Sequence, residues 1–365
     1  VCLLFAFEND AHERRVKEIV QDELALPVSV SSEVLPEIRE YERTLATAMD
    51  AALRPVMESY LGALERDIAD LGVPADVQVM GSNGGSMAAT TARERPVRTL
   101  LSGPAAGVQG AAHIAANAGM RDAITMDMGG TSCDVSLVTG GQPVASSEVS
   151  VGPYPVSTPM VDVHTVGAGG GSVAWIDEGG ALRVGPRSTG ADPGPICYGR
   201  GGTEPTVTDA HFLLGRLRPT SFDADLSPDR DAVRSGIARH VADPLGMGVE
   251  EAAAGILKVA NANTERALRV VSVERGHDPR DLGLVAFGGA GPLHAAELAA
   301  ALDVPRVLVP RAAGALSALG LLASDVVYDY GVSRVRAWNS IDPGTIEETF
   351  REFETEGRDR LAEEG

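Results

Sequence analysis

The chain has 365 residues, of which 44% are hydrophobic, so it is long enough for two domains or for one large two-lobed domain. Its formal net charge of -20, from 31 basic and 51 acidic side chains, argues against sequence-independent binding to nucleic acid or to an anionic membrane, because both need basic patches. Cys2, Cys133 and Cys197 have neither the spacing of a zinc ribbon nor that of a disulfide framework, so a reducing, cytoplasmic setting is expected.

The first residues, 1–7, form an apolar run that predicts a buried strand. A helical pattern over 11–24 and an extended stretch over 27–34 follow, so a parallel βαβ unit is predicted at the start. No apolar run reaches the length of a membrane helix, and no basic region followed by an apolar core marks a signal peptide. The chain opens without a methionine and stops inside an acidic amphipathic helix, 346–364, so we expect a protein truncated at both ends.

Residues 35–71 have a helical pattern that is interrupted at Pro55, which is expected at the first turn of a second helix. A short strand over 77–80 then runs into the glycine turn 81–86. An alanine-rich helix begins within 102–108. Its N-terminus suits an anion through free amides and the helix dipole, although most helices begin this way without binding one.

The stretch 124–138 reads as two apolar strands joined by a glycine turn. Asp127 precedes the turn and Asp134 follows it, with hydroxyl side chains between them. Glycine lets backbone amides approach a phosphate closely, and the carboxylates can orient a metal-bound water or a nucleophile. Gly-Gly is also common in ordinary hairpins, so both interpretations stay open. Cys133 is expected to pack rather than to react, because strand thiols usually do.

A β-rich segment over 154–166 contains Asp162 and His164. The two are two positions apart, so in a strand their side chains lie on one face. Together they can bind a metal or act as an oriented base, and a structural hydrogen bond is the simpler alternative. The glycine run 167–172 follows directly, and its apolar flanks indicate that it is not a linker.

The stretch 185–208 is dense in glycine and proline and is either a long surface loop or an ordered functional segment. A helix follows it, in which His211 is expected at the surface. The helix predicted over 250–273 carries more polar residues than packing alone needs. A strand over 282–287 and the glycine turn 288–291 then lead into another alanine-rich helix.

Three glycine turns therefore come directly after strands, at 81–86, 129–130 and 288–291. Ligands of open α/β folds bind beyond strand ends. Turns that converge on one cleft can therefore contact an extended phosphorylated ligand along its length. The glycine-lysine pattern of P-loop NTPases is absent, and so is the glycine fingerprint of dinucleotide-binding folds. The pattern thus predicts a phosphate site of another type.

Five motifs occur in order along nearly the whole chain: SGPAAGV (102–108), DMGGTSCD (127–134), DVHTVGAGGGS (162–172), GADPGP (190–195) and AFGGAGPLHA (286–295). The second motif is similar to a phosphate motif of the ASKHA superfamily, which contains sugar kinases, heat-shock chaperones and actin. Together the motifs resemble the hydantoinase A and 5-oxoprolinase family, which includes related subunits of acetone and acetophenone carboxylases.

The resemblance implies an α/β fold with two RNase H-like lobes of the actin and sugar kinase type, with ATP between them. The N-terminal lobe would be incomplete, because the family's first Asp-x-Gly-Gly-Thr phosphate loop has no counterpart in this chain. The chain would comprise the end of the N-terminal lobe (1–100), the ATPase lobe (101–335) and the start of a truncated C-terminal region (336–365).

The resemblance also implies roles for individual residues. The phosphate clamp and nucleotide contacts would be Gly129, Gly130, Thr131, Gly288, Gly289 and Gly291. Asp127 and Asp134 would be catalytic and would hold Mg²⁺ or a water. Asp162 and His164 would line the substrate side, where His164 is also a candidate catalytic residue. With Asp127, these two are the candidate ligands of Mg²⁺ or of another divalent metal.

Family resemblance implies an ATP-dependent hydrolase subunit that opens a cyclic amide (hydantoin, N-methylhydantoin or 5-oxoproline) through a phosphorylated intermediate. One alternative is a subunit of an ATP-dependent ketone carboxylase. Another is a non-catalytic nucleotide-binding subunit, or an inert piece of one. A hydantoinase B-type partner subunit or fused domain is expected, as is an oligomer. Binding to nucleic acid or membrane is not.

Overall fold

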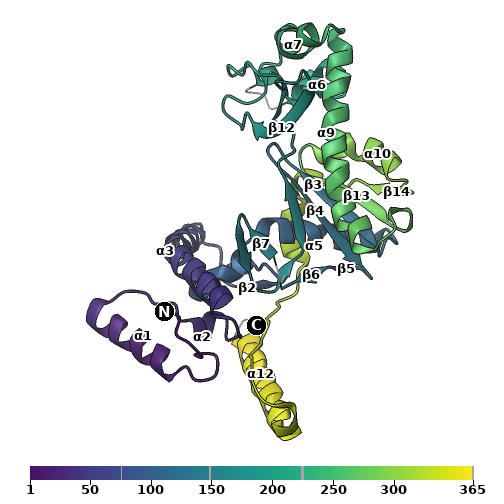
Figure 1. The fold of residues 1–365 in the computed structure, drawn as a ribbon. Helices are drawn as coiled ribbons and strands as arrows, with labels where there is room; N and C mark the ends of the chain where they lie inside the picture. The colour runs from purple at the N-terminus through teal and green to yellow at the C-terminus, as the bar shows by residue number, and fades with distance from the viewer. Residues whose placement is uncertain (75, 148, 223–225, 364–365) are drawn as a thin grey trace. The chain divides into compact units, whose positions relative to one another are not determined.

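The computed structural model describes residues 1–74, 76–147, 149–222 and 226–363, and it has a mixed α/β fold (Figure 1). The chain divides into two compact units, each built from stretches that are far apart in sequence. The first contains Val1–Ala106, Ala145–Val161 and Leu321–Gly365, and the second contains Gly107–Val144 and Asp162–Gly320. The division of the sequence into three continuous domains stays a prediction.

The second unit is organised around a mixed sheet, which has six strands in the described part of the chain. The strand order is β10 (Val163–Val166), β4 (Cys133–Thr139), β3 (Ala123–Met128), β13 (Gly283–Phe287) and β14 (Arg306–Leu308), with β5 (Gln142–Pro143) paired to β4. Strands β3, β13 and β14 run parallel, whereas β10, β4 and β3 run antiparallel. The predicted hairpin over 124–138 and the predicted strand over 282–287 are therefore confirmed.

Strand alternation gives this sheet two distinct faces. Residues of one face pack against α9 (Val249–Val271) and α10 (Gly291–Ala301) in a core that includes Met126, Val135 and Ala286. Their sequence neighbours point to the opposite face, where Val285 and Phe287 pack against residues of α5 (Ser102–Asn117). Adjacent residues of one strand thus serve different sides of the sheet.

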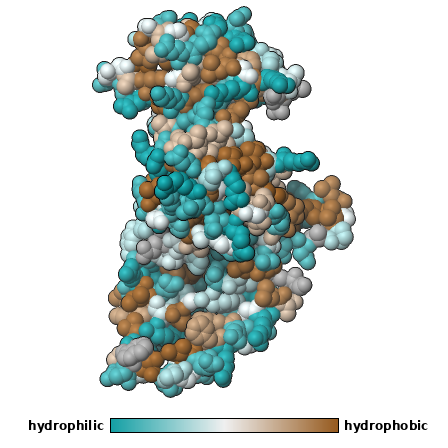
Figure 2. Space-filling model, turned by 90° about the vertical axis from the view of Figure 1, so that its right-hand side faces the viewer, coloured by the Kyte–Doolittle hydropathy of each residue, from teal (hydrophilic) through white to brown (hydrophobic). Residues whose placement is uncertain are grey.

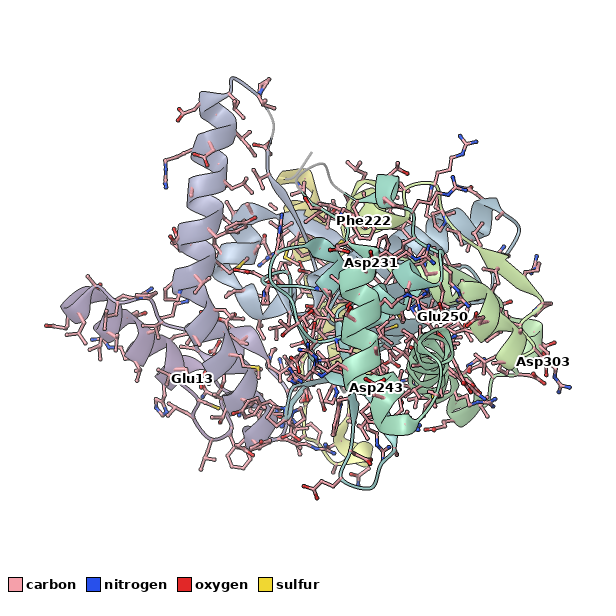
Figure 3. All side chains as sticks on the ribbon, turned by 90° about the horizontal axis from the view of Figure 1, so that it is seen from above. Glu13, Phe222, Asp231, Asp243, Glu250 and Asp303 are labelled. Atoms are coloured by element: carbon pink, nitrogen blue, oxygen red, sulfur yellow. The ribbon has the colours of Figure 1, made fainter. Side chains whose placement is uncertain are left out.

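A second core in this unit is mainly helical. It joins η2 (Ile196–Tyr198), α6 (Val207–Leu213), α7 (Arg230–Ile237) and η4 (Ala238–Ala242) to α9 and to β12 (Leu182–Ser188), which pairs with β11 (Ser172–Ile176). Figure 3 labels four residues from this region: Phe222, Asp231, Asp243 of α8 (Asp243–Leu245) and Glu250. Asp209 at the start of α6 accepts hydrogen bonds from the backbone of Ile196, Cys197 and Thr206. The stretch 185–208 is therefore tied to α6 and contains regular structure.

The first unit is mostly helical. Its helices are α1 (Ala11–Leu24), α2 (Ser31–Val34), α3 (Glu40–Asp70), α4 (Ala89–Glu94), η1 (Pro96–Thr99) and α12 (Pro343–Glu363). Its strands are short: β1 (Gln78–Met80) with β2 (Ser86–Ala88), β6 (Ala145–Ser146) with β9 (Met160–Val161), and β7 (Val149–Val151) with β8 (Tyr154–Val156). The glycine turn 81–86 connects β1 to β2 and belongs to this unit. The remaining helices of the described residues are η3 (Pro219–Ser221), η5 (Val273–Arg275), η6 (Pro279–Asp281), η7 (Ala313–Ala315), α11 (Leu316–Ala323) and η8 (Trp338–Ser340).

Two predictions for the first unit are wrong. Residues 1–7 form turns instead of a strand, and Leu4 and Phe5 are 75% and 66% exposed, so no βαβ unit exists there. Phe5 has a positive φ of 58°, which an extended strand does not allow. Pro55 lies inside the single helix α3 and does not start a second one. An apolar run cannot become a strand without a neighbouring strand to pair with.

Apolar and polar residues are mixed over the face drawn in Figure 2, with small hydrophobic areas between hydrophilic ones. Within the described ranges, no helix combines the length and the apolar character that crossing a membrane requires. The acidic helix predicted over 346–364 corresponds to α12, and Glu364 lies outside the described residues.

Candidate functional site

Two carboxylates face each other across the central hairpin. Asp127 near the end of β3 is the direct partner of Asp134 at the start of β4, and Thr165 of β10 is the next residue in the same row. Directly opposed residues of a sheet share a face, so these three side chains point the same way. The Thr165 hydroxyl donates a hydrogen bond of 2.6 Å to Oδ1 of Asp134.

The two carboxyl groups make ionisation at this position costly. Burial, together with the neighbouring charge of Asp134, raises the pKa of Asp127 to about 6. Burial also raises the pKa of Asp134, against the hydrogen bond from Thr165. Among the described residues, no group donates a hydrogen bond to the Asp127 carboxylate. A divalent cation or a shared proton would relieve this repulsion.

The turn between the two strands presents backbone donors. Gly129 N–H is bonded to Ser132 O at 3.1 Å, but the N–H groups of Gly130, Thr131 and Ser132 have no partner within the described ranges. A Cβ atom on Gly129 or Gly130 would meet nothing within 4 Å. Successive free N–H groups in an open turn are suited to an anion such as a phosphate.

The glycine run 167–172 contacts this turn through its backbone. Gly170 N–H donates to Gly129 O at 3.0 Å, and Gly171 N–H donates to Gly130 O at 2.7 Å. A Cβ atom on Gly169 would lie 2.7 Å from the backbone of Gly130 and Thr131. The glycine run noted in the sequence therefore holds the hairpin turn by direct backbone contact, a partner that sequence reasoning did not identify.

The turn after β13 packs against the end of β3. Ala290 N–H donates to Met128 O at 2.8 Å, and Gly288 has a φ of 78°. A Cβ atom on Gly289 would meet nothing within 4 Å, as for the hairpin glycines. A Cβ atom on Gly291 would lie 3.4 Å from Met126 O. Two of the three predicted glycine turns, 129–130 and 288–291, thus lie together.

The predicted metal set of Asp127, Asp162 and His164 is not assembled. His164 is one residue before Thr165 in β10, so its side chain lies on the opposite sheet face from Asp127. Asp162 precedes β10 and is held by the guanidinium of Arg275, whose Nη2 is 3.1 Å from Oδ1. In the described part of the chain, no three Asp, Glu, His or Cys side chains are grouped for a metal. The reason is strand alternation, which the motif spacing did not include.

His164 instead borders a cavity of about 280 Å³ on the α9 side of the sheet. The polar side chains of Asn263 and Arg266, both on α9, also line this cavity. The polar positions noticed in the sequence of this helix therefore include two that face a cavity. No prediction from the sequence had connected them with His164.

A buried histidine pair was missed. His211 is 1% exposed, contrary to the surface position expected for it, and its Nε2 lies 3.2 Å from Nε2 of His294. His294 Nδ1 lies 2.6 Å from Oδ1 of Asn261, which also donates through Nδ2 to Glu297. Because Asn261 Oδ1 can only accept, His294 carries its proton on Nδ1 and accepts the Nε2 proton of His211. Burial lowers the pKa of His211 to about 3 and that of His294 to about 4.

Sequence comparison matches residues 43–330 to the model of a family described as hydantoinase/oxoprolinase. The caprolactamase alpha subunit of Pseudomonas jessenii is 41% identical over 333 residues, covering 90% of this chain and 48% of that protein. 5-Oxoprolinase 1 of Arabidopsis thaliana is 36% identical over 387 residues, covering all of this chain and 30% of that protein. The acetone carboxylase beta subunit of Xanthobacter autotrophicus is 33% identical over 341 residues, with 91% and 47% covered.

Solved structures give the same picture. The crystal structure of the ATP-dependent caprolactamase from Pseudomonas jessenii matches with a TM-score of 0.84 and 38% identity, over 99% of this chain and 53% of that chain. The nucleotide-free acetone carboxylase matches with a TM-score of 0.75 and 32% identity, over 88% of this chain and 46% of that one. The chain thus spans about half the length, or less, of these relatives.

Proposed function

The chain belongs to the hydantoinase/oxoprolinase family, and from that premise we propose that its second unit binds the phosphates of ATP to activate a cyclic amide. The substrate is a lactam-like ring such as a hydantoin, N-methylhydantoin or 5-oxoproline. We propose further that the whole protein has two RNase H-like lobes, with nucleotide between them. The relatives named caprolactamase and 5-oxoprolinase support this choice of reaction.

One observation carries the proposal: three unpartnered N–H groups at Gly130, Thr131 and Ser132 lie beside the two carboxylates Asp127 and Asp134. Free N–H groups can donate hydrogen bonds to phosphate oxygens. Two neighbouring carboxylates with raised pKa values can coordinate a cation that is bound to the phosphates. The residues therefore fit Mg²⁺-ATP. Mg²⁺ commonly uses one or two carboxylates and completes its shell with phosphates and water.

In this mechanism the chain's residues position and neutralise charge. The turn N–H groups donate to phosphate oxygens, and Gly289 leaves room for the nucleotide beside them. Asp127 and Asp134 would hold the cation, and the hydrogen bond from Thr165 fixes the position of Asp134. When bound, Mg²⁺-ATP would supply the γ-phosphoryl group to the amide oxygen, with ADP as the leaving group, so that water can add to the activated carbon, the ring C–N bond can break and phosphate is released. His164 and the cavity beside it remain our candidates for the substrate side, with His164 as base.

Ketone carboxylation is the alternative, and the match to acetone carboxylase at a TM-score of 0.75 favours it. Relatives named as alpha, beta and gamma subunits support a partner subunit of the hydantoinase B type in an oligomer. We place the protein in the cytoplasm, in line with its unpaired cysteines.

The test is phosphate release from Mg²⁺-ATP by the protein assembled with its partner subunit, with 5-oxoproline, hydantoin, caprolactam and acetone compared. We expect release to be stimulated by at least one cyclic amide and not by acetone. Stimulation by acetone alone would support the carboxylase alternative. Nucleotide binding without any stimulated turnover would indicate a non-catalytic subunit, and absence of nucleotide binding would indicate an inert chain.

A further inference from the structure

The first unit contains a cavity of about 440 Å³ that the proposed function does not use. This volume is within the usual range for small-molecule sites. Part of its wall is apolar, with Val34 and Leu35 buried beside it. The rings of Tyr330 and Phe353, which also line it, stack with centroids 5.7 Å apart.

Most carboxylates around this cavity are already engaged. Four have an ion-pair or hydrogen-bond partner: Asp10 with Arg14 at 2.5 Å, Glu33 with Lys17 at 2.7 Å, Asp329 with Asn83 at 2.6 Å and Glu356 with Arg360 at 3.1 Å. The remaining one is Glu37, and burial raises its pKa, which disfavours its charged form. Three of these carboxylates are neutralised by ion pairs, whereas Asp329, bonded to a neutral amide, keeps its charge and acts on Arg98.

Two arginines in the wall have no direct ion pair within the described ranges. In the ranges that the structure describes, the Arg95 guanidinium has no hydrogen bond and no direct ion pair, although Glu356 and Glu33 act on it electrostatically. Arg98 donates from Nη2 to the backbone oxygen of Asp329 at 3.1 Å and to no carboxylate. Burial and the neighbouring Arg95 lower the pKa of Arg98 to about 10. Two half-buried guanidinium groups without a direct ion pair in the described ranges keep donors free, so this wall favours an anion.

Unsatisfied hydroxyl groups mark the same cavity. Thr158 and Tyr330 line it, and each has a buried oxygen with no hydrogen-bond partner among the described residues. Thr158 is only 5% exposed. Buried polar groups normally have partners, so an occupant with polar atoms is the nearest source of them.

We propose that this cavity binds a small organic carboxylate, with its charged end at Arg95 and Arg98 and its apolar part against Val34 and Leu35. A planar guanidinium matches a carboxylate through two parallel hydrogen bonds. A bare phosphate ion would satisfy the arginines but would leave the apolar wall uncovered. This proposal does not rest on the proposed ATP-dependent reaction, because its residues belong to the other unit.

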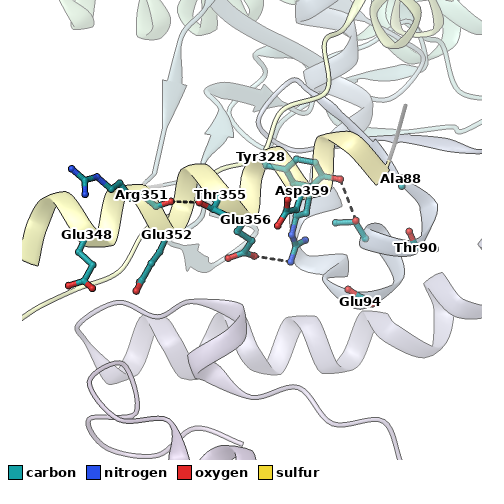
Figure 4. Close-up of a pocket in the computed structure, with 12 residues that line it drawn as sticks. Ala88, Thr90, Glu94, Tyr328, Glu348, Arg351, Glu352, Thr355, Glu356 and Asp359 are labelled. Atoms are coloured by element: carbon teal, nitrogen blue, oxygen red, sulfur yellow. Dashed lines mark hydrogen bonds and ion pairs between the residues drawn. The ribbon is translucent and has the colours of Figure 1, made fainter.

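The neighbouring groove beside α12 differs from this cavity in the pairing of its arginines (Figure 4). Its two arginines are already paired, Arg351 with Glu347 at 3.4 Å and Arg360 with Glu356 at 3.1 Å. In Figure 4, dashed lines start from the labelled Glu356 and Tyr328, whose partners are Arg360 and Thr91. A groove whose cations already have partners offers no free charge to an anion.

Calorimetric titration of the full chain tests the proposal with three probes: cyclopentanecarboxylate, cyclopentanecarboxamide and inorganic phosphate. The first two share their ring and differ in charge. We expect the carboxylate to bind at least about tenfold more tightly than the carboxamide, as a charge-assisted contact requires. Equal affinities for the two, or binding of phosphate without the carboxylate, would overturn the proposal.

Matched variants assign the binding to the arginines. Arg95→Gln should weaken carboxylate binding about tenfold or more, whereas Arg351→Gln, which removes an already paired arginine outside this lining, should change it less than about threefold. Unchanged affinity in Arg95→Gln would refute the assignment. If Arg95→Gln does not fold, Arg95→Lys is the second variant. It keeps the charge but cannot form the two parallel hydrogen bonds of a guanidinium, so carboxylate affinity should still fall. Mg²⁺-ATP titration of the same variants should be unaffected, which separates this site from the proposed nucleotide site.

Discussion

Asp127 occupies the space that a side chain at Gly288 would need: a Cβ atom built there would lie 2.3 Å from Oδ1 of Asp127. It would also lie 2.5 Å from the backbone oxygen of Met128. The glycine after β13 thus lets the second turn reach the end of β3. Through this contact, two motifs that are far apart in sequence form one site.

Gly288→Ala should therefore destabilise the chain by about 2–4 kcal/mol, because it adds both a clash and a strained positive φ. The matched control is Gly289→Ala, which would meet nothing within 4 Å and should change the free energy of unfolding by less than about 1 kcal/mol. Denaturant unfolding of the two variants measures the difference. Equal stabilities of Gly288→Ala and Gly289→Ala would mean that the close contact between Gly288 and Asp127 does not restrict the side chain at 288.

Gly130→Ala should leave the fold intact and weaken Mg²⁺-ATP binding about tenfold, since its methyl group would enter the open side of the turn. Gly248→Ala at the N-cap of α9 also adds a methyl group in open space and should not change the affinity. Isothermal titration with Mg²⁺-ATP gives both values. Equal binding by wild type and Gly130→Ala would exclude the hairpin as a phosphate site.

Asp127→Asn should stabilise the chain at neutral pH. The pKa of Asp127 is raised to about 6 in the folded state, above its ordinary value of 3.8, so the folded protein holds this proton more tightly than the unfolded chain. Stability is therefore lost as pH rises from about 4 to 6, and the penalty stays above 6. We expect the variant to gain about 1–3 kcal/mol at pH 7.5 and almost nothing near pH 3.5. A gain of equal size at both pH values would contradict this explanation, and phosphate release by the variant should still be lost.

The buried histidine pair predicts the opposite pH dependence. Both pKa values are lowered, to about 3 and about 4, so the unfolded chain binds more protons below pH 6.5 and stability falls as pH drops towards 4. His211→Gln should lose about 2 kcal/mol less than wild type between pH 7 and 4.5. His113→Gln, on the exposed side of α5, is the control and should follow wild type. Urea unfolding across this pH range measures the free energy of unfolding. If it falls equally with pH in wild type and His211→Gln, the histidine pair does not cause the loss.

Much of the site's local structure was predictable. The Asp127 to Asp134 hairpin and the strand and helix around Gly288 follow from alternation, glycine turns and an alanine-rich helix, all of which act within a few residues. The buried, unreactive character of Cys133 was predicted for the same reason, and burial raises the pKa of its thiol. The family also followed from the order of the motifs along the chain.

Other features needed neighbours that the sequence does not specify. Residues 1–7 have the apolar pattern of a strand and still form turns, since no strand among the described residues of the first unit pairs with them. His211 has the sequence setting of a surface residue, but α10 brings His294 against it. The contact joins positions 83 apart in sequence, so no local pattern predicts it.

By itself, the sequence determined the turn chemistry of this protein: which strands end in glycine, where carboxylates flank the turn, and in what order the motifs follow. Only the tertiary structure decided which of these groups meet. It joined the turns at Gly130 and Gly288 with the glycine run at Gly169, and it separated Asp127 from His164. The physical reason is that backbone preferences act over a few residues, whereas strand pairing and the face on which each side chain lies are set by packing between distant segments.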